Sequence, residues 1–112
     1  MAMSRDELRK RIEKLPRVQL GHFPTPLEYL PRLTEAIGGP RILIKRDDCT
    51  GLAFGGNKTR QLEFTIGQGI DRGADVLIGG AGSQSNHCRQ LSAGAAKLGV
   101  KAAVAVVKDH KA

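Results

Sequence analysis

Apolar residues near the start of the chain recur with the spacing of one face of an α-helix. These apolar positions are Leu8, Ile12 and Leu15. Ser4 and Glu7 precede them with the spacing of a capping box, and Pro16 follows them. The pattern therefore predicts a first helix that Pro16 ends.

Prolines and glycines punctuate the next part of the chain. The stretch 23–26 (FPTP) is expected to be extended, because proline disfavours helix in the residue before it. A second short helix is expected next, interrupted near Pro31 and ended by Gly38 and Gly39. Its apolar positions are Leu27, Leu30, Leu33 and Ile37. Residues 41–46 (RILIKR) then predict a strand rich in branched side chains.

A glycine-containing loop, residues 47–57 (DDCTGLAFGGN), separates this strand from a second run of helical periodicity. That run covers residues 58–72, although Gly67 and Gly69 each weaken the helix by about 1 kcal/mol relative to alanine. Four further elements follow: a buried strand at 75–78 (DVLI), a loop at 79–83 (GGAGS), an alanine-rich helix at 84–98 capped by Gly99, and a second buried strand at 101–107 (KAAVAVV).

The last three elements predict a strand–helix–strand unit with parallel strands and a right-handed crossover. A parallel sheet needs helices on both faces, and so few strands cannot complete one. The expected fold class is therefore α/β, with an incomplete parallel sheet and flanking helices. We expect a piece of a longer protein, in which residues 1–50 are the N-terminal segment of the larger domain and residues 51–112 begin a smaller, open α/β domain that is truncated here.

Composition adds few constraints to this picture. The chain has 112 residues, of which 40% are hydrophobic, as expected of a soluble globular protein. Much of the formal net charge of +7 lies between Arg5 and Arg17. A solvated helix face explains that charge best, because the segment has no nucleic-acid-binding motif. A basic module that binds anions or nucleic acid stays open as an alternative, with an affinity that would fall steeply with salt.

The two cysteines and the N-terminus bear on localisation. Cys49 and Cys88 lie far apart without metal-ligand spacing, so both are expected to be reduced thiols in a cytoplasmic protein. The first residues have no apolar core of a secretory signal. No stretch approaches the roughly 18 apolar residues of a membrane span. We therefore expect neither a membrane nor a nucleic-acid partner.

Lys58 follows a glycine-rich loop and begins a predicted helix. Gly51 and Gly56 have the separation found in a phosphate-binding P-loop, but Asn57 stands between the second glycine and the lysine, which argues against that motif. The positive end of a helix dipole disfavours a charged ammonium, and Schiff-base chemistry requires a neutral amine. From spacing alone, a solvent-exposed lysine in the first helical turn explains the pattern better.

A second glycine-rich turn lies between a strand and a helix. Gly80 and Gly82 match two positions of the dinucleotide-binding fingerprint, but Ser85 stands where the third glycine should be. Asp109 could serve as the ribose-binding acid, although it lies farther along than usual. A dinucleotide-binding domain therefore stays open as an alternative.

The first turn of the helix after that loop carries polar residues next to free backbone N–H groups, which can bind an anion such as a substrate carboxylate. Ser85 could relay a proton, and Asn86 could donate to a phenolate-like oxygen, but simple helix capping would also explain them. His87 alone would be a surface histidine. We expect Cys88 to be a packing residue and Arg89 to pair with an acidic group on the helix surface.

Two motifs in order resemble a known family. The run IKRDDCTGLAFGGNKTRQLEF and the later GSQSNHCRQ closely resemble the pyridoxal-phosphate enzymes related to D-cysteine desulfhydrase and 1-aminocyclopropane-1-carboxylate deaminase. The entry segment FPTPLEYLPRL is also similar, so the resemblance covers about residues 20–107. It implies the fold of the tryptophan-synthase β-subunit class, with two α/β domains and pyridoxal 5′-phosphate between them.

The resemblance also implies roles for four residues. Lys58 would bind the cofactor covalently, and Asn86 would hydrogen-bond the cofactor's ring oxygen. Ser85 would contact the substrate and take part in catalysis. The backbone from Ser85 to His87 would hold the substrate carboxylate. The phosphate-binding loop, the partner of the pyridine nitrogen and the downstream tyrosines of the family have no counterpart in this chain.

The activity implied is that of a lyase or deaminase acting on a small amino acid. Conversion of D-cysteine to pyruvate, hydrogen sulfide and ammonia is the first expectation. Deamination of 1-aminocyclopropane-1-carboxylate or removal of sulfite from cysteate is the alternative. The resemblance also implies a homodimer for the full-length protein, and it suggests that the present chain alone is inactive.

Overall fold

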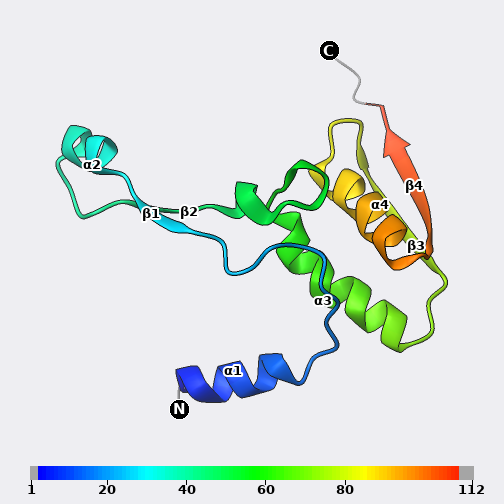
Figure 1. Cartoon of the computed structure of the whole chain (residues 1–112). Coiled ribbons are helices and arrows are strands. Elements are labelled where there is room, and N and C mark those ends of the chain that lie inside the picture. Colours follow the sequence, from blue (N-terminus) through cyan, green and yellow to red (C-terminus); the bar gives the residue numbers. More distant parts are fainter. Residues whose placement is uncertain (1–2, 109–112) are drawn as a thin grey trace.

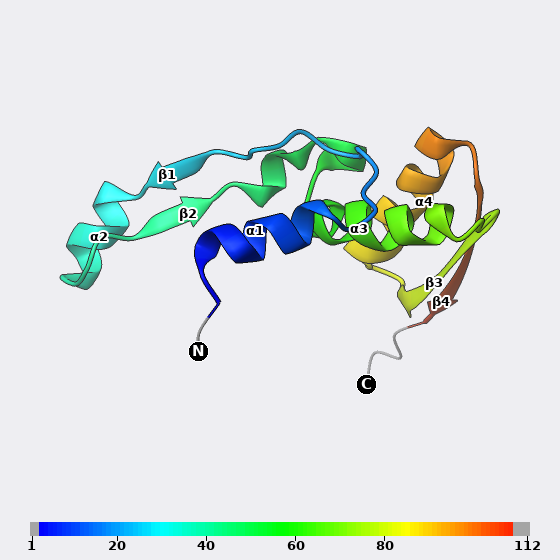
Figure 2. The same ribbon diagram turned by 90° about the horizontal axis from the view of Figure 1, so that it is seen from below.

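The structure is a computed structural model that describes residues 3–108. A body and a projecting arm are visible from two directions (Figures 1 and 2). The body consists of α3 (Lys58–Asp71), β3 (Val76–Gly82), α4 (Asn86–Leu98) and β4 (Lys101–Val107). The arm consists of β1 (Leu27–Tyr29), α2 (Pro31–Ile37) and β2 (Leu43–Lys45). None of the helices within residues 3–108 is long and apolar enough to cross a membrane.

Helix α1 (Arg5–Glu13) confirms the first predicted helix. Ser4 is its N-cap, and the Ser4 hydroxyl accepts a hydrogen bond from the Glu7 N–H at 3.2 Å. Glu7 also pairs with Arg11 one turn later at 2.9 Å, in an exposed position. No residue of α1 is buried, so its basic residues form the solvated face that the sequence predicts.

The arm corrects the predicted start of the second helix. The expectation that Leu27 lies in this helix is wrong, because Leu27–Tyr29 pairs antiparallel with Leu43–Lys45 as strand β1. Pro31 is the first helical residue of α2, where its missing N–H would have no partner. The proline ring also disfavours helical backbone at Leu30, which has φ −107° and ψ 80°. Gly38 ends the helix in the left-handed conformation, as expected.

The loop after β2 is more regular than predicted. It contains two short 3₁₀ helices, η1 (Asp47–Thr50) and η2 (Leu52–Phe54). Helix α3 begins at Lys58 directly after this loop, and its bounds agree closely with the predicted helix at 58–72. The loop therefore places Lys58 at a helix N-terminus, as the sequence indicates.

The strand–helix–strand prediction is confirmed. Strands β3 and β4 pair in parallel, from Val76 opposite Lys101 to Gly82 opposite Val107, and α4 lies between them in sequence. Gly99 caps α4 in the left-handed conformation, with φ 72° and ψ 22°. The predicted loop at 79–83 is wrong, however, because β3 continues through Gly82. Pairing with β4 supplies hydrogen bonds that the local glycine-rich sequence does not reveal.

The two parallel strands are also less buried than predicted. Leu77 is buried, but the neighbouring Ile78 is 77% exposed and Val107 is 67% exposed. Successive side chains of a strand point to opposite faces, and within residues 3–108 the helices of the body cover one face of this pair. The prediction of two buried strands is therefore wrong for β4, which has no buried residue, and in β3 it holds only for Leu77.

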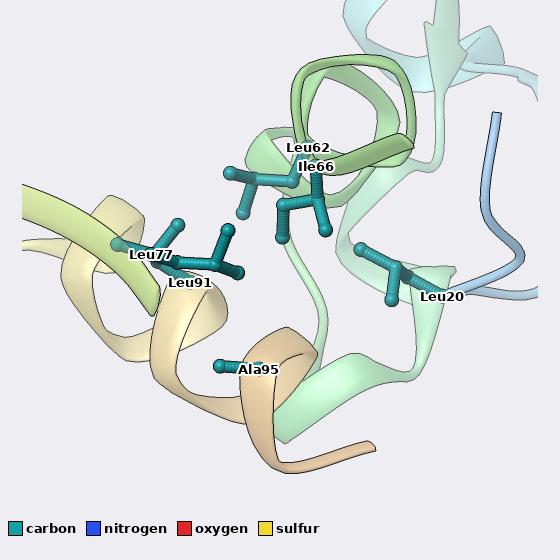
Figure 3. Close-up of a cluster of buried hydrophobic side chains, with 6 residues drawn as sticks. All are labelled: Leu20, Leu62, Ile66, Leu77, Leu91 and Ala95. Atoms are coloured by element: carbon teal, nitrogen blue, oxygen red, sulfur yellow. The ribbon is translucent and has the colours of Figure 1, made fainter. Parts of the chain in front are cut away.

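The hydrophobic core lies between α3, α4 and β3 (Figure 3). Its six buried side chains are Leu20, Leu62, Ile66, Leu77, Leu91 and Ala95, each at most 8% exposed. Close packing here depends on Gly94, because a Cβ atom at that position would lie 3.1 Å from the Ile66 Cδ1 atom. The core thus fixes α3 against α4, the two helices whose N-termini carry the candidate residues.

Residues 17–21, here called the strap, cross α3 and insert Leu20 into the core. The Val18 N–H donates to the Glu63 carbonyl at 3.0 Å, and Lys97 of α4 donates to the Leu20 carbonyl at 3.0 Å. A Cβ atom on Gly67 would lie 2.8 Å from the Arg17 Cα atom. Gly67 therefore lowers helix propensity but permits the close approach of the strap to α3.

Candidate functional site

The N-terminal ends of α3 and α4 are joined through one backbone carbonyl. The Gly55 carbonyl accepts a hydrogen bond from the Arg89 Nη2 atom at 3.3 Å and from the Gln90 Nε2 atom at 3.2 Å. Gly55 lies three residues before Lys58, whereas Arg89 and Gln90 lie in the first turns of α4. These bonds bring the two sequence motifs together, although the residues they join are more than thirty positions apart.

Buried side-chain hydrogen bonds reinforce the connection. Gln90 and Thr59 are fully buried, and the Thr59 hydroxyl donates to the Gln90 Oε1 atom at 2.5 Å. The Gly56 N–H donates to the Thr50 hydroxyl at 2.9 Å, and Thr50 is also fully buried. Buried polar groups are costly unless paired, so this network holds the turn before Lys58 in one conformation.

Gly55 has no room for a side chain. Its φ of 76° and ψ of −178° belong to a region that only glycine adopts without strain, and an added Cβ atom would overlap the Asp48 carbonyl. We expect Gly55→Ala to lower the free energy of unfolding by about 3 kcal/mol, the upper end for such strained positions. Urea unfolding followed by circular dichroism would measure this loss.

Gly73→Ala is the matched control for that substitution. Gly73 also has a positive φ, of 81°, but nothing lies within 4 Å of an added Cβ atom. Gly73→Ala should therefore lower the free energy of unfolding by about 1 kcal/mol, from backbone strain alone. Equal losses for the two variants would contradict the close contact between Gly55 and η1.

An ion pair supports the loop from its other side. The Asp47 carboxylate accepts hydrogen bonds from the Arg60 guanidinium, at 2.7 Å for the shorter contact, and from the Thr25 hydroxyl at 2.8 Å. The Arg60 hydrogen bonds, aided by Thr25, lower the pKa of Asp47 from 3.8 to about 2. The Asp47 carbonyl also accepts the Gly56 N–H at 3.0 Å. Asp47 therefore stays charged at neutral pH and holds the loop against the first turn of α3.

The structure places all four predicted site residues at the two helix N-termini. Lys58 is the first residue of α3 and is half-buried. Ser85 is the N-cap of α4, where its hydroxyl oxygen accepts the Cys88 N–H at 3.2 Å. Asn86 is the first residue of α4 and is exposed, and its Oδ1 atom accepts a hydrogen bond from Arg89 at 3.1 Å. Capping by Ser85 is thus real, and its O–H remains available as a donor.

His87, the fourth predicted residue, points to a different surface. Its side chain lines a cavity of about 340 Å³ between α3, β3 and α4, together with Leu62, Leu77 and Leu91. Its imidazole lies close to Gly79 of β3, so the role expected of His87 can rest only on its backbone. Cys88 is buried, in agreement with its expected role in packing.

Sequence reasoning missed Thr59, Arg89 and Gln90. Arg89 was expected to pair with an acidic residue, but it binds the Gly55 carbonyl and the Asn86 side chain instead. Gln90 lies within a helix that reads as alanine-rich, and its complete burial follows from contact with a distant loop. A local pattern carries no signal for such contacts.

The glycine-rich strand end argues against the dinucleotide alternative. Gly80 and Gly82 pair with Ala105 and Val107 inside the parallel sheet, and the turn to α4 contains only Ser83, Gln84 and Ser85. A phosphate-binding fingerprint needs its glycines in the loop after the strand. Asp109, the acid considered for that alternative, lies outside the described residues.

The arrangement can perform two kinds of chemistry. Lys58 supplies a primary amine that can capture a carbonyl group as a Schiff base. The first-turn N–H groups of Asn86 and His87 have no intrahelical acceptor, so together with the helix dipole they can bind an anionic group. An amine at the N-terminus of α3 and an anion-binding N-terminus of α4, joined through the Gly55 carbonyl, suit a ligand with both a carbonyl and a negative charge.

Comparisons with known proteins agree with this chemistry. Residues 18–112 match the sequence profile of the family described as pyridoxal-phosphate dependent enzyme. A 1-aminocyclopropane-1-carboxylate deaminase of Rhizobium leguminosarum bv. viciae is 53% identical over 95 residues, which cover 83% of this chain and 28% of the relative. A D-cysteine desulfhydrase of Klebsiella pneumoniae subsp. pneumoniae is 53% identical over 91 residues, which cover 81% of this chain and 27% of the relative.

A solved structure is also similar. The crystal structure of an ACC deaminase homologue superposes with a TM-score of 0.83 and 32% identity, over 98% of this chain and 39% of that one. This likeness confirms the predicted α/β fold class, with a parallel sheet and flanking helices. The chain spans little more than a quarter of the length of the curated relatives it matches.

Proposed function

The chain belongs to the family of pyridoxal-phosphate-dependent enzymes, and on that premise we propose that Lys58 binds the cofactor covalently in a lyase or deaminase of small amino acids. The hydrogen-bonded connection between the turn before Lys58 and the first turns of α4 carries this proposal. It supports the proposal because it joins the turn that leads to Lys58 to the helix whose N-terminus carries Ser85 and Asn86.

The residues present fit the cofactor. Pyridoxal phosphate, when bound, withdraws electrons from the α-carbon of an amino acid. Lys58 would hold its aldehyde carbon, and the Nδ2 atom of Asn86 would donate to its ring oxygen. The Oδ1 atom of Asn86 is already occupied by Arg89, so the amide donors are the groups that remain free to bind.

The same residues would orient and deprotonate a substrate. The N–H groups of Asn86 and His87 would bind the substrate carboxylate at the positive end of α4. Lys58, once displaced by the substrate amine, would take a proton from the substrate carbon. The Ser85 O–H would donate to the substrate, because its oxygen is held by the Cys88 N–H. These groups orient the bond to be broken and stabilise developing charge.

We propose desulfhydration of D-cysteine as the first reaction to test and deamination of 1-aminocyclopropane-1-carboxylate as the second. Relatives named for each activity are equally identical to this chain, at 53%, so both have the same support. Lys58, Ser85 and Asn86 do not distinguish the two substrates. We further propose that the full-length protein is a homodimer with residues 1–50 in the larger domain.

Product analysis of the full-length protein tests the proposal. D-Cysteine should yield pyruvate, sulfide and ammonia in equal amounts, whereas 1-aminocyclopropane-1-carboxylate should yield 2-oxobutyrate and ammonia without sulfide. L-Cysteine and cysteate serve as comparison substrates, and a borohydride-reduced sample serves as the inactivated control. Release of no 2-oxo acid from any of these amino acids would contradict the proposed reaction class.

A further inference from the structure

Arg89 contacts two parts of the candidate site, although the proposed function gives it no contact with the cofactor or the substrate. It lies in the first turn of α4, and its Nη2 atom donates to the Gly55 carbonyl at 3.3 Å and to the Asn86 Oδ1 atom at 3.1 Å. One nitrogen therefore contacts both the loop that leads to Lys58 and the side chain of Asn86. No other side chain in residues 3–108 is recorded with hydrogen bonds to both groups.

Arg89 is half-buried, and the surroundings of its Nη1 atom argue against a role in binding an anion directly. Its Nη1 atom has no exposed surface and no hydrogen-bond partner within residues 3–108. The ion pairs found in this part of the chain involve other arginines, namely Arg11, Arg17, Arg46 and Arg60. An arginine on a solvated face keeps its head group in water. A guanidinium with one buried nitrogen and no carboxylate partner within residues 3–108 calls for another explanation.

The contact with Asn86 fixes which end of its carboxamide faces outward. A guanidinium has five N–H donors and no acceptor, so it can bind only the oxygen end of the Asn86 side chain. The amino group of Asn86 then points away from Arg89 with its two donors free. Without Arg89, the exposed carboxamide could rotate and present its oxygen to an incoming acceptor, which would repel it.

We propose that Arg89 is a positioning residue that holds the Asn86 carboxamide with its amino group toward the cofactor oxygen. The hydrogen bond to the Gly55 carbonyl holds Arg89 against the loop that leads to Lys58. This inference rests on the proposed function in one respect, namely that the acceptor which Asn86 meets is the ring oxygen of pyridoxal phosphate.

The first test needs no cofactor. In the full-length apoprotein with ¹⁵N-labelled asparagine, the side-chain N–H signals of Asn86 are assigned by their loss in Asn86→Ala. They should show restricted motion in the wild type and become mobile in Arg89→Met. Asn57 is an internal reference, because it is exposed and makes no capping hydrogen bond through its side chain. Equal Asn86 mobility with and without Arg89 would overturn the inference.

The second test is a double-mutant cycle on cofactor affinity. Arg89→Met should weaken binding of pyridoxal phosphate by about two- to tenfold, the range of one hydrogen bond. If Arg89 acts through Asn86, the double variant should bind no worse than Asn86→Ala alone. Additive losses would instead mean a merely structural role and would overturn the inference.

Control variants separate these outcomes from loss of fold. Lys97→Met removes a positive charge and a hydrogen bond to the Leu20 carbonyl at the other end of α4, so Asn86 mobility should not change. Where Arg89→Met does not fold, Arg89→Lys retains the charge but lacks the planar fork that arginine presents to its acceptors. Absence of any cofactor adduct in the wild type would contradict the proposed function, while the Asn86 signals would still decide the role of Arg89.

Discussion

Replacing Lys58 by alanine is expected to abolish covalent attachment of pyridoxal phosphate to the full-length protein. Alanine is the best helix former, so the first turn of α3 should persist without the amine. Borohydride reduction followed by mass spectrometry of peptides should find the cofactor on the Lys58 peptide of the wild type and on no peptide of Lys58→Ala. The visible absorbance band of the bound cofactor should disappear with it.

Turnover should fall together with attachment. If Lys58 also moves the substrate proton, its loss should lower kcat by at least about 10²- to 10⁴-fold, even when free cofactor is supplied in excess. Lys101→Ala is the matched control, because Lys101 is an exposed lysine at the start of β4. That variant should retain the absorbance band and the activity. An unchanged band in Lys58→Ala, or an adduct at another lysine in the wild type, would contradict the assignment.

The position of Lys58 could be predicted because its signals are local. A glycine-rich loop and a change to helical periodicity mark the start of α3, and the structure begins the helix at this residue. The start of α4 is similarly marked by Ser85, which the structure confirms as an N-cap. Each motif could therefore be placed at a helix N-terminus, but periodicity says nothing about how two helices meet.

The connection between the motifs could not be predicted, because it depends on burial. Gln90 and Arg89 are of types found mostly on surfaces, yet Gln90 is fully buried, Arg89 is half-buried, and both bond to the Gly55 carbonyl of the loop before α3. Strand β3 shows the same limit, since Gly80 and Gly82 are poor strand residues that become a strand by pairing with β4. In both places long-range contacts, and not local propensity, decide the structure.

The division into domains at residue 50 stays a prediction.

The largest loss of stability among single substitutions outside the candidate site is expected at Glu63. This carboxylate is 1% exposed and accepts four hydrogen bonds or ion-pair contacts from the strap. Two come from the Arg17 guanidinium, at 2.6 and 2.5 Å, and two come from the N–H groups of Leu20 and Gly21, at 2.9 and 3.0 Å. Glu63 thereby connects the strap to α3, the helix that begins with Lys58.

Glu63→Ala should lower the free energy of unfolding by about 3 kcal/mol, mainly through the buried N–H groups that lose their acceptor, because the Arg17 side chain is itself 45% exposed. The Leu20 and Gly21 N–H groups would be left buried without acceptors, and each such group costs about 1–3 kcal/mol. Because Leu20 belongs to the core, movement of the strap would also loosen the contact between α3 and α4. Urea unfolding of the full-length protein, followed by far-ultraviolet circular dichroism, would measure the loss.

Glu7→Ala provides the comparison that isolates burial from charge. Glu7 also pairs with an arginine, Arg11, and both lie in α1. The side chain of Glu7 is 53% exposed, however, and that of Arg11 is 64% exposed. Exposed pairs one helical turn apart contribute only about 0.3–0.5 kcal/mol, so this variant should unfold almost as the wild type does. A loss at Glu63 no larger than that at Glu7 would mean that the carboxylate does not hold the strap. The apolar contact of Leu20 and the hydrogen bonds of the Val18 N–H and the Leu20 carbonyl would then keep it in place.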